Sequence, residues 1–133
     1  MQVKEAVKAV QVELNSYFSS NMDIQYLLTH ISNMDIQYLL AHISRWHHER
    51  NLIHGSTDKD QFHKLIQECG ELSDSMCKGK DIKDDIGDII VVLINIAERN
   101  NLTIKECVAK AWDDIKDRKG EMRDGIFIKE ADL

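Results

Sequence analysis

The sequence predicts an all-α fold, a helical bundle whose four-helix core is completed within one subunit or by dimerisation. Apolar residues recur at helical spacing through most of the 133-residue chain. The chain contains no proline, the residue that most strongly interrupts helices. Residues 61–76 and 81–99 each combine an apolar stripe with a polar stripe, and only a short break separates them. Two helices joined by so short a connection are expected to pack as antiparallel neighbours.

The first of these helices follows Ser56 and Thr57, which suit a loop and an N-terminal cap. Gly79 suits the position just after its end, and Asp81 suits the N-cap of the next helix. Residues three and four apart share one face of a helix. The expected core face therefore holds Leu65, Ile66, Cys69, Leu72 and Met76, and the polar stripe beside it holds Gln61, Lys64, Glu68, Glu71 and Ser75.

The second helix repeats this layout. Its apolar stripe holds Ile82, Ile86, Ile89, Leu93, Ile96 and Ala97, and its polar stripe holds Asp81, Asp85, Asp88, Asn95 and Arg99. Taken alone, the β-branched run at residues 89–94 suits a buried strand, but the apolar residues on both sides continue it in helical phase. This helix is apolar nearly all round, so we expect a second subunit to cover Ile90, Val91 and Ile94.

Four carboxylates are expected to meet at the edge of this core. Counted outward from the break, Glu71 and Asp88 are level, and Glu68 and Asp85 lie within about two turns of them. Like charges held together raise one another's pKa, so the arrangement is costly unless a cation sits among them. Mg²⁺ prefers oxygen ligands and typically takes a few carboxylates together with substrate phosphates. The alternative is a solvated acidic face, because acids three residues apart are common on helices.

The N-terminal third contains a tandem repeat. Residues 21–32, NMDIQYLLTHIS, recur at residues 33–44 as NMDIQYLLAHIS. A helix is expected at residues 2–18, followed by a break at residues 19–21. We expect the second copy to join the core, because it leads directly to Trp46, and the first copy to form a helical extension. The predicted division is an extra N-terminal segment, residues 1–32, and a helical domain, residues 33–133.

The C-terminal third predicts one more helix. Thr103 and Glu106 form a capping box at its start, and Gly120 is expected to end it. Its expected buried residues are Ile104, Cys107, Val108, Ala111 and Ile115.

Composition restricts the setting in which the protein works. The net charge of −6 argues against a nucleic-acid partner or a membrane surface, and no apolar run reaches the length of a membrane span. The N-terminus lacks a signal-peptide pattern. The three cysteines are an odd number without metal-ligand spacing, which indicates reduced thiols in a cytoplasmic protein, with Cys69 and Cys107 packed in the core.

The acidic motifs resemble those of a known family. Glu68-x-x-Glu71, a short spacer, and Asp85-x-x-Asp88 followed by apolar residues are similar to the MazG-type all-α nucleoside triphosphate pyrophosphohydrolases. The resemblance extends more loosely over residues 43–129. The sequence departs from the family at Gln67, where a second glutamate is usual, and at Asp85, where glutamate is usual.

This resemblance implies an enzyme that cleaves a nucleoside or deoxynucleoside triphosphate to the monophosphate and pyrophosphate, as in clean-up of the nucleotide pool. The four acids would hold Mg²⁺, or alternatively Mn²⁺. Glu68 or Glu71 would in addition take the proton of the attacking water, and the sequence does not choose between them. The expected assembly is a homodimer or a homotetramer.

The resemblance also suggests substrate contacts. Trp46 is similar to a family tryptophan that lies near the nucleotide base, although a tryptophan closing the helix packing fits the pattern equally. Lys116, Arg118 and Lys119 are similar to a basic segment that would grip the triphosphate, although basic residues in a last turn also suit the helix dipole. The tail from residue 122 to 133 is similar to a closing segment packed over the domain.

Three polar residues on the acid stripes complete the candidate site. Lys64 is a candidate for substrate binding, and Asn95 and Arg99 are candidates for contacts to ribose or phosphate, with Asn95 nearer to the acids. Two alternatives to the general enzyme stay open. A related pyrophosphohydrolase acting on dUTP or phosphoribosyl-ATP would share the acids, and a non-catalytic helical binding module would keep the bundle without needing them.

Overall fold

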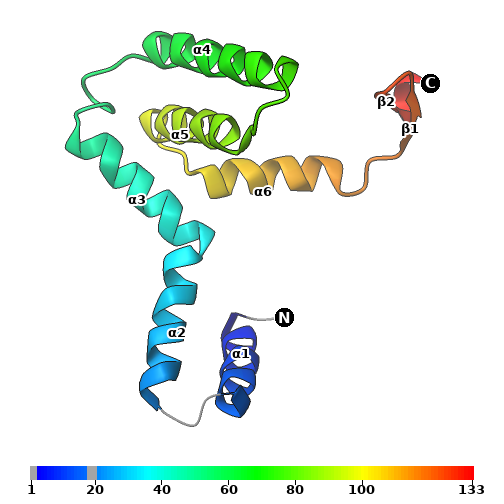
Figure 1. The fold of residues 1–133 in the computed structure, drawn as a ribbon. Coiled ribbons are helices and arrows are strands. Elements are labelled where there is room, and N and C mark those ends of the chain that lie inside the picture. Colours follow the sequence, from blue (N-terminus) through cyan, green and yellow to red (C-terminus); the bar gives the residue numbers. More distant parts are fainter. Residues whose placement is uncertain (1–2, 18–20) are drawn as a thin grey trace. The chain divides into compact units, whose positions relative to one another are not determined.

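A computed structural model describes residues 3–17 and 21–133, and it confirms the all-α fold class (Figure 1). The helices are α1 (Val3–Tyr17), α2 (Asn21–Met34), α3 (Ile36–Glu49), α4 (Asp58–Cys77), α5 (Lys83–Arg99) and α6 (Ile104–Ile115). A hairpin of β1 (Gly120–Arg123) and β2 (Ile126–Lys129) follows, and then the short 3₁₀ helix η1 (Glu130–Asp132). Within the described residues, no helix is long and apolar enough to cross a membrane.

The chain divides into two compact units, Met1–Ile43 and Ser44–Leu133. This division falls inside α3, whose last turns belong to the second unit. The expected division at residues 32 and 33 stays a prediction.

The first unit contains α1 and α2, and α1 confirms the predicted N-terminal helix. Of the predicted break at residues 19–21, Ser19 and Ser20 lie outside the described residues. The second repeat copy begins at the end of α2 and continues into α3 after Asp35, whose Oδ1 accepts the Gln37 N–H at 2.7 Å. Ile36 is 61% exposed and Leu39 44% exposed, so the expectation that the second copy joins the core was wrong for its first turns.

The second unit is built on the α4–α5 hairpin, whose ends follow the predicted signals. Thr57 caps α4 through a capping box with Asp60. Gly79 takes the left-handed conformation just after α4, with φ 65°. Ile82 rather than Asp81 holds the N-cap position of α5, but Asp81 Oδ1 still accepts the Lys83 N–H at 2.9 Å. The apolar run at residues 89–94 is helical, as predicted.

The core of the second unit is centred on the second half of α5, which is buried on more than one side. Its buried apolar residues are Ile53, Val92, Ile94 and Ala97, and the polar residues buried with them are His47, Glu68 and Asn95. Ile94 is only 4% exposed within a single chain, so the expectation that a second subunit must cover it was wrong. Ile90, one turn before Ile94 on the same side of α5, remains 40% exposed.

Only part of the expected core face of α4 is covered. Ile66 and Met76 are 56% and 60% exposed, whereas Glu68, from the polar stripe, is 6% exposed. The helix is thus rotated so that the stripe of Glu68 faces α5, with half-buried Leu65 and Leu72 on either side. Cys69 and Cys107 are exposed, which contradicts their predicted core packing.

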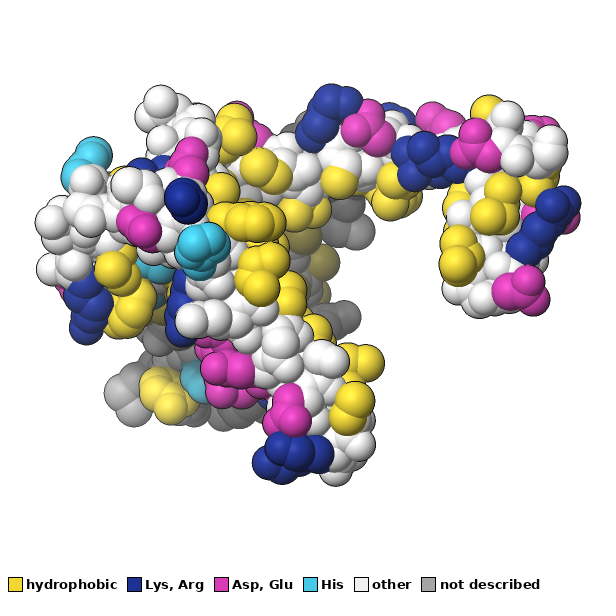
Figure 2. Space-filling view, turned by 90° about the horizontal axis from the view of Figure 1, so that it is seen from above, with side chains coloured by type: hydrophobic (Ala, Val, Ile, Leu, Met, Phe, Trp, Pro, Cys, Tyr) yellow, Lys and Arg dark blue, Asp and Glu magenta, His cyan; other side chains and the backbone are white. Residues whose placement is uncertain are grey.

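Helix α6 is amphipathic, but its apolar face is uncovered. It buries no residue, contrary to prediction, and Val108, Trp112 and Ile115 are about half or more exposed. Hydrophobic side chains are visible on the surface of the segment that leads to the C-terminal hairpin (Figure 2). The predicted capping box of Thr103 and Glu106 is confirmed. The helix ends at Ile115 rather than at Gly120.

The C-terminal segment forms a β-hairpin that the sequence analysis did not anticipate. Arg123 pairs with Ile126 across a two-residue turn at Asp124 and Gly125, both with positive φ. Asp-Gly between short strands is a strong hairpin signal, because that turn needs left-handed backbone at both positions. Only Ile128 is partly buried in the two strands, so the expected packing of this tail over the domain was wrong in a single chain.

Candidate active site

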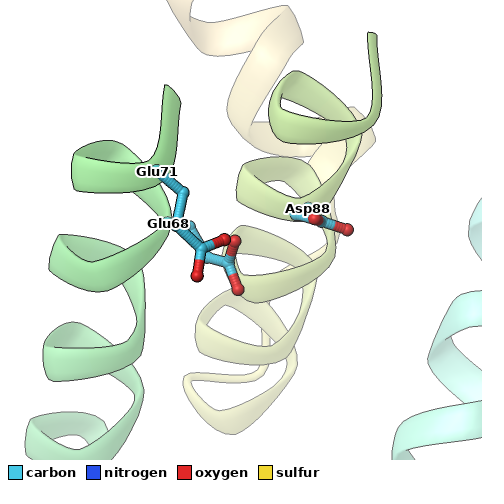
Figure 3. Close-up of side chains that lie close together, drawn as sticks. All are labelled: Glu68, Glu71 and Asp88. Carbon is cyan, nitrogen blue, oxygen red and sulfur yellow. The ribbon is translucent and has the colours of Figure 1, made fainter. Parts of the chain in front are cut away.

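The α4–α5 hairpin brings three of the four predicted acids together. Glu68 and Glu71 share a face of α4, and Asp88 lies on α5 (Figure 3). One carboxylate oxygen from each of these residues lies within 4.8 Å of the other two. The cluster follows from local sequence, because a spacing of three residues aligns two glutamates and the short turn at Gly79 sets the two helices level.

Glu68 is the buried member of this acid cluster. Its Oε1 accepts from Lys64 Nζ at 3.0 Å, and its Oε2 is buried without a hydrogen-bond partner among the described residues. A buried carboxylate oxygen without a donor is costly. The orphaned oxygen, close to two further carboxylates, fits a hard divalent cation, which prefers oxygen ligands.

The electrostatics of the cluster agree with this geometry. Contact with the Glu68 carboxyl raises the pKa of Glu71, and the Glu68 charge raises it further. Partial burial raises the pKa of Asp88, with the charges of Asp84 and Glu68 adding to it. The Glu68 carboxylate raises the pKa of Lys64. The acids therefore repel one another, and Lys64 compensates them only in part.

Asp85 is not part of the acid cluster but lies beside it. With Glu71 it lines an open cavity of about 640 Å³, whose other lining residues are Gln67, Gly70, Asp74 and Ser75. Gln67, which stands where the resembling family has a second glutamate, thus faces the same space. The predicted set of four acids becomes a cluster of three with a fourth at the wall of an adjoining polar cavity.

One family of known proteins matches the part of the chain that contains this site. Residues 57–122 match the family of the MazG nucleotide pyrophosphohydrolase domain. The chain carries a MazG-type domain. All four acids lie inside it, as do both capping boxes.

One curated relative is a protein of Haemophilus phage HP1 (strain HP1c1) described as an "Uncharacterized 18.2 kDa protein in rep-hol intergenic region". It is 43% identical to this chain over 60 residues, which cover 44% of this chain and 37% of the phage protein. No solved structure matches the chain significantly.

Asn95 lies in the core of the MazG-type domain rather than at its surface. It is 0% exposed, and its Nδ2 donates to the Leu52 carbonyl at 3.1 Å and to His47 Nδ1 at 3.2 Å. His47 Nε2 in turn donates to the Val91 carbonyl at 2.9 Å. A fully enclosed amide offers no surface to a nucleotide, so we remove Asn95 from the candidate substrate contacts.

Arg99 is also engaged within the MazG-type domain. Its Nε donates to Asp58 Oδ1 at 3.0 Å, and its guanidinium also donates to the Ile53 carbonyl. Arg99 thus holds the end of α5 to the start of α4 and to the loop before it. These contacts give Arg99 a structural role, so its position on the acid stripe does not require a contact to substrate.

Trp46 remains available as a surface for stacking. It is 44% exposed, and the Arg50 guanidinium lies 4.5 Å from the centre of its ring. The neighbouring His47 anchors this turn of α3 to Val91, about one helical turn beyond Asp88 on α5. The end of α3 is therefore fixed next to the acid-bearing part of α5.

The predicted basic segment lies at the end of α6. Lys116 pairs with Asp113 of its own helix at 3.2 Å, and Arg118 and Lys119 are exposed. The structure does not bring these three residues together with the acid cluster. Their contact with a triphosphate stays a prediction.

Sequence reasoning missed the polar contacts between α3 and α5. Besides the His47–Asn95 pair, Glu98 accepts from the Ser44 hydroxyl and, at 2.7 Å, from His48 Nε2. The residues of each pair lie about fifty positions apart. Their spacing therefore carries no local signal that could have identified them.

Proposed function

We propose that this chain hydrolyses nucleoside or deoxynucleoside triphosphates to the monophosphate and pyrophosphate in the presence of Mg²⁺. Membership of residues 57–122 in the MazG nucleotide pyrophosphohydrolase domain family supports the reaction class. The observation that carries the proposal is the orphaned oxygen of buried Glu68, close to the carboxylates of Glu71 and Asp88.

Glu68, Glu71 and Asp88 would hold the cation, with Asp85 at the edge of the same site. When bound, Mg²⁺ (or Mn²⁺) neutralises phosphate charge and makes the phosphorus more open to attack by water. Of the two glutamates, Glu71 is the better candidate for accepting a proton from the water. It is exposed, and its raised pKa makes its carboxylate more basic than an ordinary one.

The cavity beside Glu71 is our candidate for the nucleotide-binding region. Its volume of about 640 Å³ falls within the usual range of small-molecule sites, roughly 300–1,000 Å³. Two aspartates in its wall, Asp74 and Asp85, would repel a free polyphosphate. The cavity therefore favours a nucleotide that arrives together with its cation. Gln67 and Ser75 supply neutral hydrogen-bonding groups in the cavity wall.

A homodimer or homotetramer is part of this proposal. Phe62, Ile66 and Met76 are each more than half exposed on α4, and Trp112 is 60% exposed on α6. An exposed apolar surface of this extent on a small domain suits association. A second copy would cover it, as a helical bundle built from two subunits requires.

Release of pyrophosphate and nucleoside monophosphate tests the proposal directly. The eight common NTPs and dNTPs are incubated with the full chain and millimolar Mg²⁺, and both products are quantified. We expect equal amounts of the two products, and loss of turnover in Glu71→Gln. Asp113→Asn on α6 is the control for removing one carboxylate elsewhere. Absence of turnover on the eight substrates, on dUTP and on phosphoribosyl-ATP would favour the non-catalytic binding module.

A further inference from the structure

The ion pair between Lys64 and Glu68 differs from the other lysine pairs of the same spacing. Lys64 Nζ lies 3.0 Å from Glu68 Oε1, and the side chains are 51% and 8% exposed. In Lys78–Asp74, at the C-terminal end of the same helix, both side chains are more than half exposed. Lys64 thus spans from solvent to the one buried carboxylate of the acid cluster.

Lys64 occupies the position that suits a cation. Its ammonium contacts Glu68 and interacts electrostatically with Glu71 and Asp88, the same carboxylates that fit a divalent ion. One ammonium does not balance three carboxylates, and Glu68 Oε2 stays without a donor. A divalent ion bound to these oxygens would lie close to the ammonium, and the two positive charges would repel each other.

We propose that Lys64 is an exchangeable counter-ion, which holds Glu68 while the site is free of metal and leaves it when a divalent cation binds. This inference rests on the proposed metal-dependent function. The exchange needs no change in the backbone, because the lysine stem is flexible and the Lys64 side chain is already half exposed. The released ammonium is then free to bind a phosphate oxygen of the nucleotide, so cation binding prepares a contact for the substrate.

Metal binding without nucleotide tests the exchange. Mg²⁺ is titrated into the full-length wild type, Lys64→Gln and Lys78→Gln by calorimetry. Lys78→Gln removes the same charge from an exposed pair of the same spacing at the C-terminal end of α4. We expect Lys64→Gln to bind Mg²⁺ about fivefold more tightly than wild type, at the lower end of typical coupling between ligands. Lys78→Gln should change the affinity less than twofold, and Lys64→Arg, which keeps the charge, should not tighten it.

Chemical labelling supplies a second readout. Acetylation of Lys64 by an amine-reactive reagent, followed by mass spectrometry, should rise severalfold when Mg²⁺ is added, because the amine loses its partner. Labelling of Lys78 and Lys110 in the same samples should stay constant.

Two outcomes overturn the exchange, and they separate it from the proposed function. In the first outcome, wild type binds Mg²⁺ and Glu71→Gln does not, so the metal site stands. If Mg²⁺ then leaves Lys64 labelling unchanged, and Lys64→Gln binds Mg²⁺ no more tightly than Lys78→Gln, the exchange is wrong. If wild type binds no Mg²⁺ at all, both are wrong. Because Lys64 is half exposed, we expect Lys64→Gln to fold, and its circular dichroism spectrum checks this.

Discussion

Replacing Asp88 with asparagine removes one charge from the acid cluster and nearly preserves the shape of the side chain. Burial and the charges of Asp84 and Glu68 raise the pKa of Asp88 above its usual 3.8. A raised folded-state pKa means that the protonated form is favoured in the fold. The contribution of Asp88 to stability is therefore fully present below pH 3.8 and is lost as the pH rises through the raised pKa. At neutral pH the ionised group destabilises the metal-free protein.

The expected size of this effect follows from the cluster geometry. Oxygens of Asp88 and Glu68 lie within 4.8 Å. Two unit charges at that separation repel by about 1 kcal/mol in bulk water and by about 3.5 kcal/mol at an effective dielectric near 20. Asp88 is partly exposed and Lys64 offsets some of the charge, so the lower figure applies. A gain of about 1 kcal/mol raises the Tm of a domain of this size by roughly 4 °C.

Thermal melts of wild type and Asp88→Asn at pH 7, with and without millimolar Mg²⁺, measure both effects. Without metal the variant should melt higher, and the difference should disappear below pH 3.8. Mg²⁺ should stabilise wild type by about 2.7 kcal/mol at a hundred times its Kd. The variant should lose most of that shift because it lacks one ligand. Asp84→Asn, on the same helix but outside the cluster, should keep it. Equal Mg²⁺ shifts in wild type and Asp88→Asn would refute the metal site.

Three further predictions follow from the fold. Asn95→Ala should lower stability by about 2 kcal/mol in denaturant melts, because it leaves the Leu52 carbonyl and His47 without their buried donor; a loss under half that size would contradict this role. Deletion of residues 1–32 should leave a folded, active domain, since Ser44–Leu133 is a compact unit by itself; loss of the helical circular dichroism signal would contradict it. Ile66→Lys, at a 56% exposed position, should yield folded monomer in light scattering, whereas a monomeric wild type would exclude the proposed assembly.

The sequence by itself determined the features that depend on neighbouring residues. Capping at Thr57 and Thr103 follows from the residues three positions later, and the left-handed turn at Gly79 follows from its missing side chain. The pairing of Glu68 with Glu71 needs only helical spacing, and a short turn then aligns them with Asp88. The hairpin turn at Asp124 and Gly125 belongs to the same class, because its signal was present in the sequence although our prediction overlooked it.

Only the tertiary structure decided which face of each helix is covered. The apolar stripe of α4 predicts a core face, yet the chain buries Glu68 and leaves Ile66 exposed, because α4 packs against α5 with the side that carries Glu68. Periodicity identifies an apolar face but does not say which partner covers it. The same limit applies to Asn95, whose spacing on α5 suggested a substrate contact. Its burial depends on His47 and Leu52, more than forty residues earlier, and contacts at that separation arise only when the whole unit folds.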